Sequence, residues 1–191
     1  LAPLFSHLPL VVLATIILVA VTPLIDIASL QRAWEYDRAE GLTLLLTALG
    51  VLVFGIEGGI ILGVCLSIAS QLWRGSRPHV AVVGRVPGTQ SFRNVSRHLV
   101  EIEPHLLALR IDENIFFANT KAVERALLEA FRDYPDTRHV LLILSAVNHI
   151  DSTGLDMLSE LTEGFAERGV RLHLAEVKGP LMDQLTDTDW I

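Results

Sequence analysis

The stretch HVLLILSAVNHIDSTG, residues 139–154, decides the fold of the second half of the chain. It opens on a continuous apolar run, which is typical of a strand that is covered on both faces of a sheet. It ends on Asp151, Ser152, Thr153 and Gly154, small residues that favour the first turn of a helix. A buried strand that passes through a polar turn into a helix predicts an α/β layer.

The segments on both sides of this stretch extend the same pattern. Short apolar runs bounded by turn residues predict strands, and apolar residues that repeat every three or four positions predict amphipathic helices. Asn119 and Thr120 can cap the first of these helices. We therefore expect residues 80–191 to form a mixed sheet with helices packed against it. Strands are predicted at 80–84, 106–111, 115–118, 139–144 and 170–175, and helices at 121–133, 155–165 and from 179 onward.

The first part of the chain has a different composition. The whole sequence is 51% hydrophobic, with a mean hydropathy of +0.46. Residues 1–79 hold four arginines, no lysine and five acids, which leaves 11 of the 15 basic and 17 of the 22 acidic residues for the second part. The net charge of −7 provides no basic surface for a phosphate backbone, so the composition argues against nucleic-acid binding.

Two apolar stretches indicate membrane segments in residues 1–73. Residues 8–25 carry no charge and predict a transmembrane helix, because about 18 residues approach the length that spans a bilayer. Residues 41–73 are interrupted only by Glu57, which lies among glycines. We expect a short helical hairpin with arms at 41–56 and 58–73, part of a larger bundle. The chain begins without a basic region or cleavage site, so it is expected to be a piece of a longer protein and not to start with a signal peptide.

Glu57 is the one ionisable residue inside an apolar run. An intramembrane carboxylate can serve an ion or proton pathway, but flanking glycines favour a solvated hairpin tip at the membrane surface. Both ends of the hairpin are expected to face the cytoplasm, because arginines gather beside them. Residues 74–79 then form a linker to the second domain. The arginines are Arg32, Arg38, Arg74, Arg77 and Arg85.

The polar motif at residues 150–154 allows two interpretations. Asp151, Ser152 and Thr153 can satisfy the first amides of the helix, and capping alone can explain them. Alternatively, a hydroxyl at the positive end of a helix is a favourable position for a phosphoryl group. The chain lacks a GxSxG elbow, a Walker lysine and HxxxH spacing, so no hydrolase, nucleotide cofactor or metal site is predicted. The single cysteine, Cys65, excludes an intrachain disulfide.

Taken together, four motifs resemble the SulP family of sulfate permeases and related anion transporters. The resemblance includes the membrane part, through the sequence GIEGGIILG at 55–63, and so covers essentially the whole chain. The motifs are SRPHVAVVGRVPGT at 76–89, LRIDENIFFAN at 109–119, VNHIDSTG at 147–154 and LHLAEVKGP at 172–180.

The resemblance implies a secondary transporter built from inverted repeats, usually dimeric, whose last membrane segment is followed by a cytoplasmic STAS domain. Its substrate site lies between broken half-helices upstream, so it implies no substrate-binding residue in this chain. In soluble STAS relatives the serine of the matching loop is phosphorylated and switches partner binding, which makes Ser152 the candidate regulatory site, with Thr153 and Asp151 beside it. Residues 187–191 interrupt the expected closing helix, so the domain is expected to be truncated.

Two functions follow from these expectations. The first is secondary active transport of an anion such as sulfate, bicarbonate or a dicarboxylate, in a multi-pass protein of the plasma or inner membrane. The alternative is a membrane-anchored STAS signalling module that binds a cytoplasmic protein and is switched by phosphorylation. Neither function is that of an enzyme.

Overall fold

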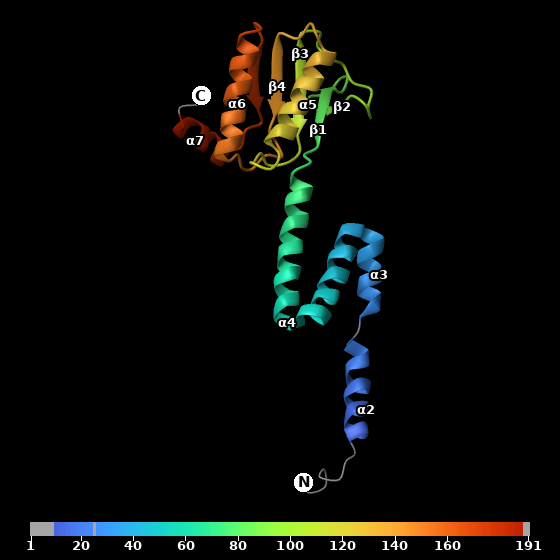
Figure 1. The fold of residues 1–191 in the computed structure, drawn as a ribbon. Coiled ribbons are helices and arrows are strands. Elements are labelled where there is room, and N and C mark those ends of the chain that lie inside the picture. The colour runs from blue at the N-terminus through green and yellow to red at the C-terminus, as the bar shows by residue number, and fades with distance from the viewer. Residues whose placement is uncertain (1–9, 25, 189–191) are drawn as a thin grey trace. The chain divides into compact units, whose positions relative to one another are not determined.

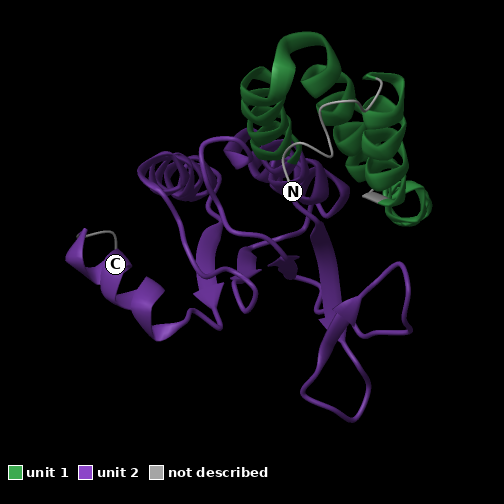
Figure 2. Ribbon diagram, turned by 90° about the horizontal axis from the view of Figure 1, so that it is seen from below, with its two compact units in different colours: residues 1–70 green, residues 71–191 purple. Residues whose placement is uncertain are grey.

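The structure, a computed structural model, describes residues 10–24 and 26–188. The chain divides into two compact units, Leu1–Ser70 and Gln71–Ile191, which Figure 2 shows in different colours. The division falls before the predicted linker at 74–79, so residues 71–73 group with the second unit.

The first described element of the first unit is an apolar helix whose α-helical part ends before the predicted bound at residue 25. Helix α2 covers Leu10–Val21 and continues as a 3-10 turn, η1, at Thr22–Leu24. Pro23 has no N–H to donate and disfavours helical backbone at the residue before it, so the α-helix ends at Val21. Residues 8, 9 and 25 of the predicted helix lie outside the described residues.

A further helix occupies the segment that we expected to be a simple connection, residues 26–40. Helix α3 covers Ile27–Tyr36, and the Asp26 carboxylate caps it by accepting a hydrogen bond of 2.9 Å from Ser29 N. The apolar period of this helix is masked in the sequence by its charged residues and short length. The sequence analysis therefore missed it.

Helix α4, Arg38–Gly75, is two helices joined at a break (Figure 1). At Gly55 the backbone has φ 80° and ψ 178°, a conformation that only glycine adopts readily. The arms on either side are about 26 Å and 30 Å long at 1.5 Å per residue. Close to the break the arms approach through Gly59, where an added Cβ would lie 2.1 Å from Val51 Cγ2. Glycine at 59 is therefore required for this packing.

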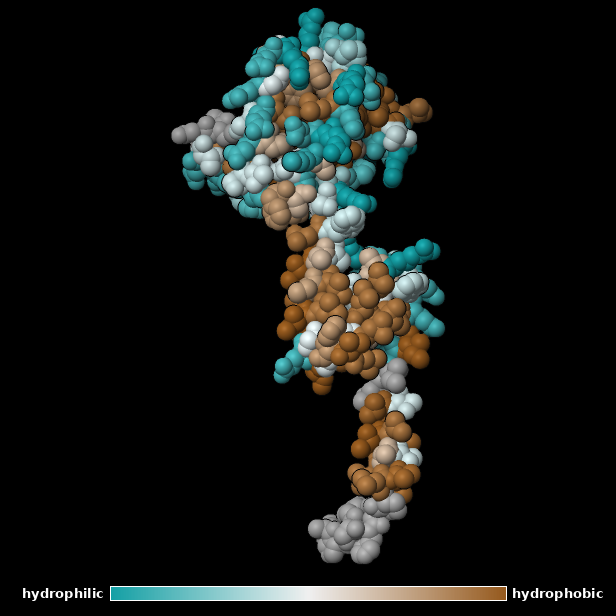
Figure 3. Space-filling view, viewed as in Figure 1, coloured by the Kyte–Doolittle hydropathy of each residue, from teal (hydrophilic) through white to brown (hydrophobic). Residues whose placement is uncertain are grey.

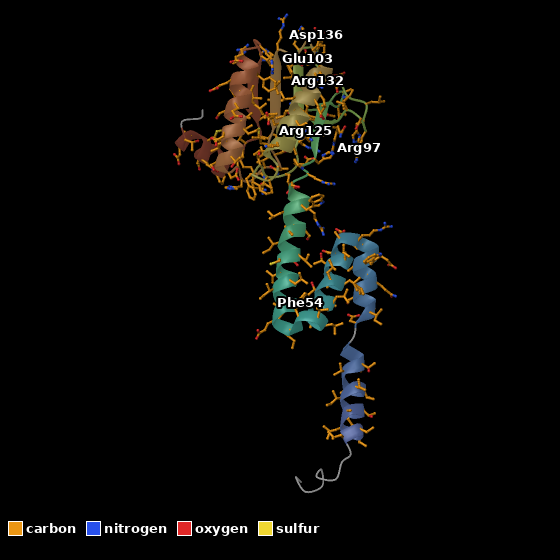
Figure 4. All side chains as sticks on the ribbon, viewed as in Figure 1. Phe54, Arg97, Glu103, Arg125, Arg132 and Asp136 are labelled. Carbon is orange, nitrogen blue, oxygen red and sulfur yellow. The ribbon has the colours of Figure 1, made fainter. Side chains whose placement is uncertain are left out.

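On the face drawn in Figure 3, the surface of α2 and α4 is mostly apolar. In the described part of the chain, α4 is the one helix whose length and composition suit a membrane crossing, and α2 is a shorter apolar helix. Phe54, labelled beside the break in Figure 4, is 70% exposed. Large exposed apolar side chains are stable where lipid or further protein covers them.

The second unit is a five-stranded mixed sheet with helices. Strand order is β2-β1-β3-β4-β5, in which β3, β4 and β5 are parallel and β1 is antiparallel to both of its neighbours. The strands are β1 Val80–Arg85, β2 Phe92–Asn94, β3 Leu106–Ile111, β4 His139–Ile143 and β5 Arg171–Ala175. The helices are α5 Thr120–Asp133, α6 Ser152–Ala166 and α7 Gly179–Asp187.

All three helices of this unit contribute to one core, which covers one face of the sheet. Leu109 and Leu142 of the sheet are 1% and 0% exposed, and Leu127, Leu158 and Leu185 of the three helices are fully buried. A smaller cluster lies on the opposite face, formed by Ala81, Val83, Ala108 and Ile143 with Phe92 packed against it. The continuous apolar run of β4 is thus explained, because both of its faces are covered.

Two sequence-based assignments in this unit were wrong. The short strand β2, Phe92–Asn94, was not predicted, because three residues carry too little alternation. Residues 115–118 were predicted to pair as a strand with 106–111, but only Ile115 forms a bridge, and its partner is Ile150. Polar side chains hold the rest of this segment as a loop.

Candidate regulatory site

The N-terminus of α6 carries the polar motif that the sequence analysis singled out. Asp151 is the N-cap residue, and its Oδ1 accepts a hydrogen bond of 2.8 Å from Gly154 N. This bond satisfies one of the amides that the first turn of a helix leaves without an intrahelical partner. Of the three polar residues of the motif, Asp151 is the one whose side chain caps the helix.

Ser152 and Thr153 are the first two residues of α6, and both are exposed. Within the described residues neither hydroxyl forms a hydrogen bond, so capping does not explain them. An accessible hydroxyl at the positive end of a fifteen-residue helix is a position where an added anion is stabilised electrostatically.

The loop that follows β3 lies against this helix end. Asp151 Oδ2 accepts a hydrogen bond of 2.8 Å from Phe117 N, so one carboxylate joins the helix to the loop. The bridge at Ile115 adds two backbone hydrogen bonds, Ile115 N to His149 O and Asp151 N to Ile115 O, each of 3.2 Å. An added Cβ at Gly154 would lie 3.0 Å from Ile115 Cγ2, so the loop and helix are in close contact.

Asn114 fixes the same loop to the turn before α6. Its Oδ1 accepts hydrogen bonds from the backbone N–H groups of Asn148 and His149, at 2.8 and 3.2 Å. Lys178, which precedes α7, donates to Asn148 Oδ1 at 2.6 Å. Three separate chain segments therefore meet at the helix end that carries Ser152.

Asn119 is fully buried at the other end of the loop. Its Nδ2 donates to Gly75 O at 3.0 Å and to Asn114 O at 2.7 Å, and its Oδ1 accepts from Phe116 N at 3.0 Å. Asn119 occupies the N-cap position of α5, as predicted, but its side chain makes no capping hydrogen bond. The sequence analysis missed this role, because the partner Gly75 is 44 residues away.

An ion-pair network lies beside the start of the loop. Asp112 accepts hydrogen bonds from Arg110 Nε at 2.6 Å and Nη2 at 3.1 Å, and its Oδ2 lies 2.8 Å from His79 Nδ1. The Arg110 hydrogen bonds, with a smaller contribution from His79, lower the pKa of the Asp112 carboxyl against the opposing effect of burial. Asp112 therefore stays ionised, and its contact with His79 holds the segment that precedes β1.

Glu57 lies in the first unit, in α4, two residues after the break at Gly55. Its side chain is exposed, and it has no hydrogen bond or ion pair within the described residues. Glu57 therefore lies close to the bend of α4, and its place at a membrane surface stays a prediction. Among the described residues, no group of His, Cys, Asp or Glu side chains that could hold a metal ion is present, and an ion-pathway role for Glu57 stays a prediction.

These observations define a class of protein. Its members have helical membrane segments followed by a mixed α/β domain, which carries a polar loop before its second helix. Two family models match this chain. The sulfate permease family matches residues 1–47, and the STAS domain matches residues 98–190.

Curated relatives agree with both family models. The chain is 31% identical to high affinity sulfate transporter 2 of Stylosanthes hamata, over 94% of this chain and 28% of that protein. It is 31% identical to sulfate transporter 3.1 of Arabidopsis thaliana, over 100% of this chain and 30% of that protein. The chain thus spans less than a third of the length of these relatives, which are transporters and not enzymes.

Solved structures share the fold. The structure of SLC26A9 superposes with a TM-score of 0.78 over 86% of this chain and 28% of that chain, at 13% identity. The murine anion transporter Slc26a9 in the inward-facing state gives 0.74 over 81% of this chain and 25% of that chain, at 15% identity. The family prediction is confirmed: this chain combines the C-terminal membrane segments of a sulfate permease-like membrane protein with a STAS domain.

Proposed function

We propose that the chain is the C-terminal part of a secondary active transporter that moves sulfate, bicarbonate or a dicarboxylate across the membrane. The observation that carries this proposal is the order of the two family matches, a sulfate permease segment at 1–47 followed by a STAS domain at 98–190. The named sulfate transporters among the relatives support sulfate as the first anion to test. The substrate-binding residues would lie in segments outside this chain.

Uptake of labelled anions by cells that express the parent protein tests this function. We expect flux of at least one of sulfate, bicarbonate or a dicarboxylate, with competition by the unlabelled anion. A parent truncated after Arg77 shows whether residues 78–191 are needed for activity or assembly. Absence of flux from the intact parent, with the protein present in the membrane, would contradict the transporter function.

The STAS domain is proposed to be the regulatory part, with Ser152 as its phosphorylation site and Thr153 as the neighbouring hydroxyl. A kinase would transfer the terminal phosphoryl group of a nucleoside triphosphate to Ser152 Oγ, which loses its proton, and release the nucleoside diphosphate. The exposure of Ser152 and its position at a helix N-terminus support this site. We expect Ser152→Ala to abolish phosphate incorporation at this peptide in native cells, whereas Thr153→Ala leaves it in place.

The orientation and assembly follow from the same proposal. Residues 74–191 would lie in the cytoplasm of a multi-pass protein in the plasma or inner membrane, because arginines flank the hairpin ends. Glu57 would lie at the opposite surface, at the hairpin tip, and the parent would be a homodimer. A regulated phosphate on Ser152 without anion flux would instead favour the signalling module with a cytoplasmic protein partner.

A further inference from the structure

The loop 112–119 lies between two functional ends of the second unit. One end is the N-terminus of α6, which Asp151, Ile115 and Asn114 join to the loop through the hydrogen bonds described above. The other end is the last turn of α4, where Asn119 Nδ2 donates to Gly75 O at 3.0 Å. The loop therefore touches both the candidate phosphorylation site and the end of the membrane helix.

The side chain of Asn119 uses all of its hydrogen-bonding groups in this connection. It is fully buried, and both of its Nδ2 hydrogens and its Oδ1 are used, on Gly75, Asn114 and Phe116. It gives up the capping bond that an asparagine at the start of α5 would ordinarily make. The contact is also close, because an added Cβ at Gly75 would lie 3.0 Å from Phe116 Cζ.

We propose that Asn119 is a positioning residue that transmits the state of Ser152 to the end of helix α4. The inference rests on the regulatory role proposed for Ser152. A phosphoryl group on Ser152 would add nearly two negative charges beside the Asp151 carboxylate. It would also compete with this carboxylate for the amides at the start of the helix. The Asp151 Oδ2 to Phe117 N bond is then weakened.

The consequence passes from Phe117 through Phe116 to Asn119. Phe117 follows Phe116, whose N–H is held by Asn119 Oδ1, and the same asparagine holds Gly75 O. Loss of the hydrogen bond to Phe117 N therefore weakens the bond between Phe116 N and Asn119 Oδ1. The bond from Asn119 Nδ2 to Gly75 O, the last carbonyl of α4, is weakened with it. The reporters are the amides of Ser76 and Arg77, which donate to Leu72 O at 2.9 Å and Arg74 O at 3.2 Å.

Amide hydrogen exchange of the full chain in lipid nanodiscs, read by mass spectrometry, tests this coupling. Ser152→Glu serves as the charge mimic, and the amides of Ser76 and Arg77 are compared with those of β4 as a check on folding. We expect Ser152→Glu to speed exchange at Ser76 and Arg77 by roughly tenfold while β4 stays protected. Asn119→Asp, which keeps the acceptor but loses both donors, should speed exchange there by itself and abolish any further response to Ser152→Glu.

Asn94→Asp is the matched control. Asn94 is partly buried, and its Oδ1 accepts hydrogen bonds from Ser96 N and Ser96 Oγ. An aspartate at this position keeps both bonds. This variant should leave the response at Ser76 and Arg77 intact. If Asn119→Asp removes the protection of β4, Asn119→Ala takes its place in the same comparison.

Two results would overturn the inference. One is a Ser152→Glu protein in which exchange changes only around residues 148–154 and not at Ser76 and Arg77. The other is a response at Ser76 and Arg77 that persists in the Asn119 variants. These readouts do not depend on anion flux. A parent protein that fails to transport would therefore contradict the proposed function but would not change the outcome of this exchange test.

Discussion

Replacing Asp151 with alanine should lower the free energy of unfolding of the second unit far more than replacing Ser152 with alanine. Asp151 makes two hydrogen bonds of 2.8 Å, to Gly154 N in its own helix and to Phe117 N across the loop. Loss of an N-cap side chain costs about 1 kcal/mol. Loss of a carboxylate that holds a second amide adds about 1.5 kcal/mol. The free energy of unfolding should therefore fall by about 2–3 kcal/mol.

Exchange of the buried β4 amides in the full chain measures this change, because they open only when the unit unfolds. A loss of about 2–3 kcal/mol corresponds to roughly 30- to 150-fold faster exchange. Ser152→Ala, which removes a hydroxyl with no hydrogen bond in the described residues, should change exchange by less than about twofold. Asp151→Asn keeps one carboxamide oxygen and should give an intermediate rate.

The result that would refute this reasoning is equal destabilisation by Asp151→Ala and Ser152→Ala. Equal effects would mean that the hydroxyl is part of the cap and that the division of roles in the motif is wrong. A change below twofold for Asp151→Ala would mean that the two hydrogen bonds contribute little.

Three further predictions concern other parts of the chain. Gly59→Ala should destabilise the first unit by more than about 2 kcal/mol and speed exchange in α4, because the new methyl overlaps Val51; unchanged exchange would show that the arms do not pack there. Gly164→Ala, within α6 and with open space around its Cβ position, should slow β4 exchange about fivefold, as expected for about 1 kcal/mol; faster exchange would contradict this environment. Because Arg110 lowers the pKa of Asp112, the stability that this pair contributes is full above the unfolded carboxyl pKa of 3.8 and is lost as pH falls through the lower folded value. Asp112→Asn should cost about 1 kcal/mol at pH 7 and show a smaller loss of stability on acidification below pH 4, by fluorescence; an unchanged acid profile would count against the pair.

Much of the fold could be predicted from the sequence, because the relevant signals are local. The apolar run of β4 and the helical spacing of Val123 and Leu127 are short-range patterns, and the corresponding elements are present. The glycines near Glu57 indicated a break in the second apolar stretch, and the chain bends at Gly55. The failures were elements too short to show a period, β2 among them.

The candidate site divides in the same way. The sequence identified Asp151, Ser152 and Thr153 as a polar group at a helix start, but it could not separate their roles. The separation depends on Phe117, which lies 34 residues from Asp151 and reaches it only when β3 and β4 pair in parallel. Pairing at such a distance leaves no periodic trace in the sequence.

The sequence by itself therefore determined the two physical halves of the chain, the helices and strands with a clear period, and the motif that opens α6. Only the tertiary structure decided that the Asp151 side chain holds that motif in place and that the hydroxyls of Ser152 and Thr153 form no hydrogen bond within the described residues. Asn119 shows the reason most directly: as a residue before a helix it predicted a cap, but folding brings the Gly75 carbonyl within 3.0 Å of its Nδ2. A buried amide must satisfy its donors with the partners that the fold provides, and those partners are set by long-range packing.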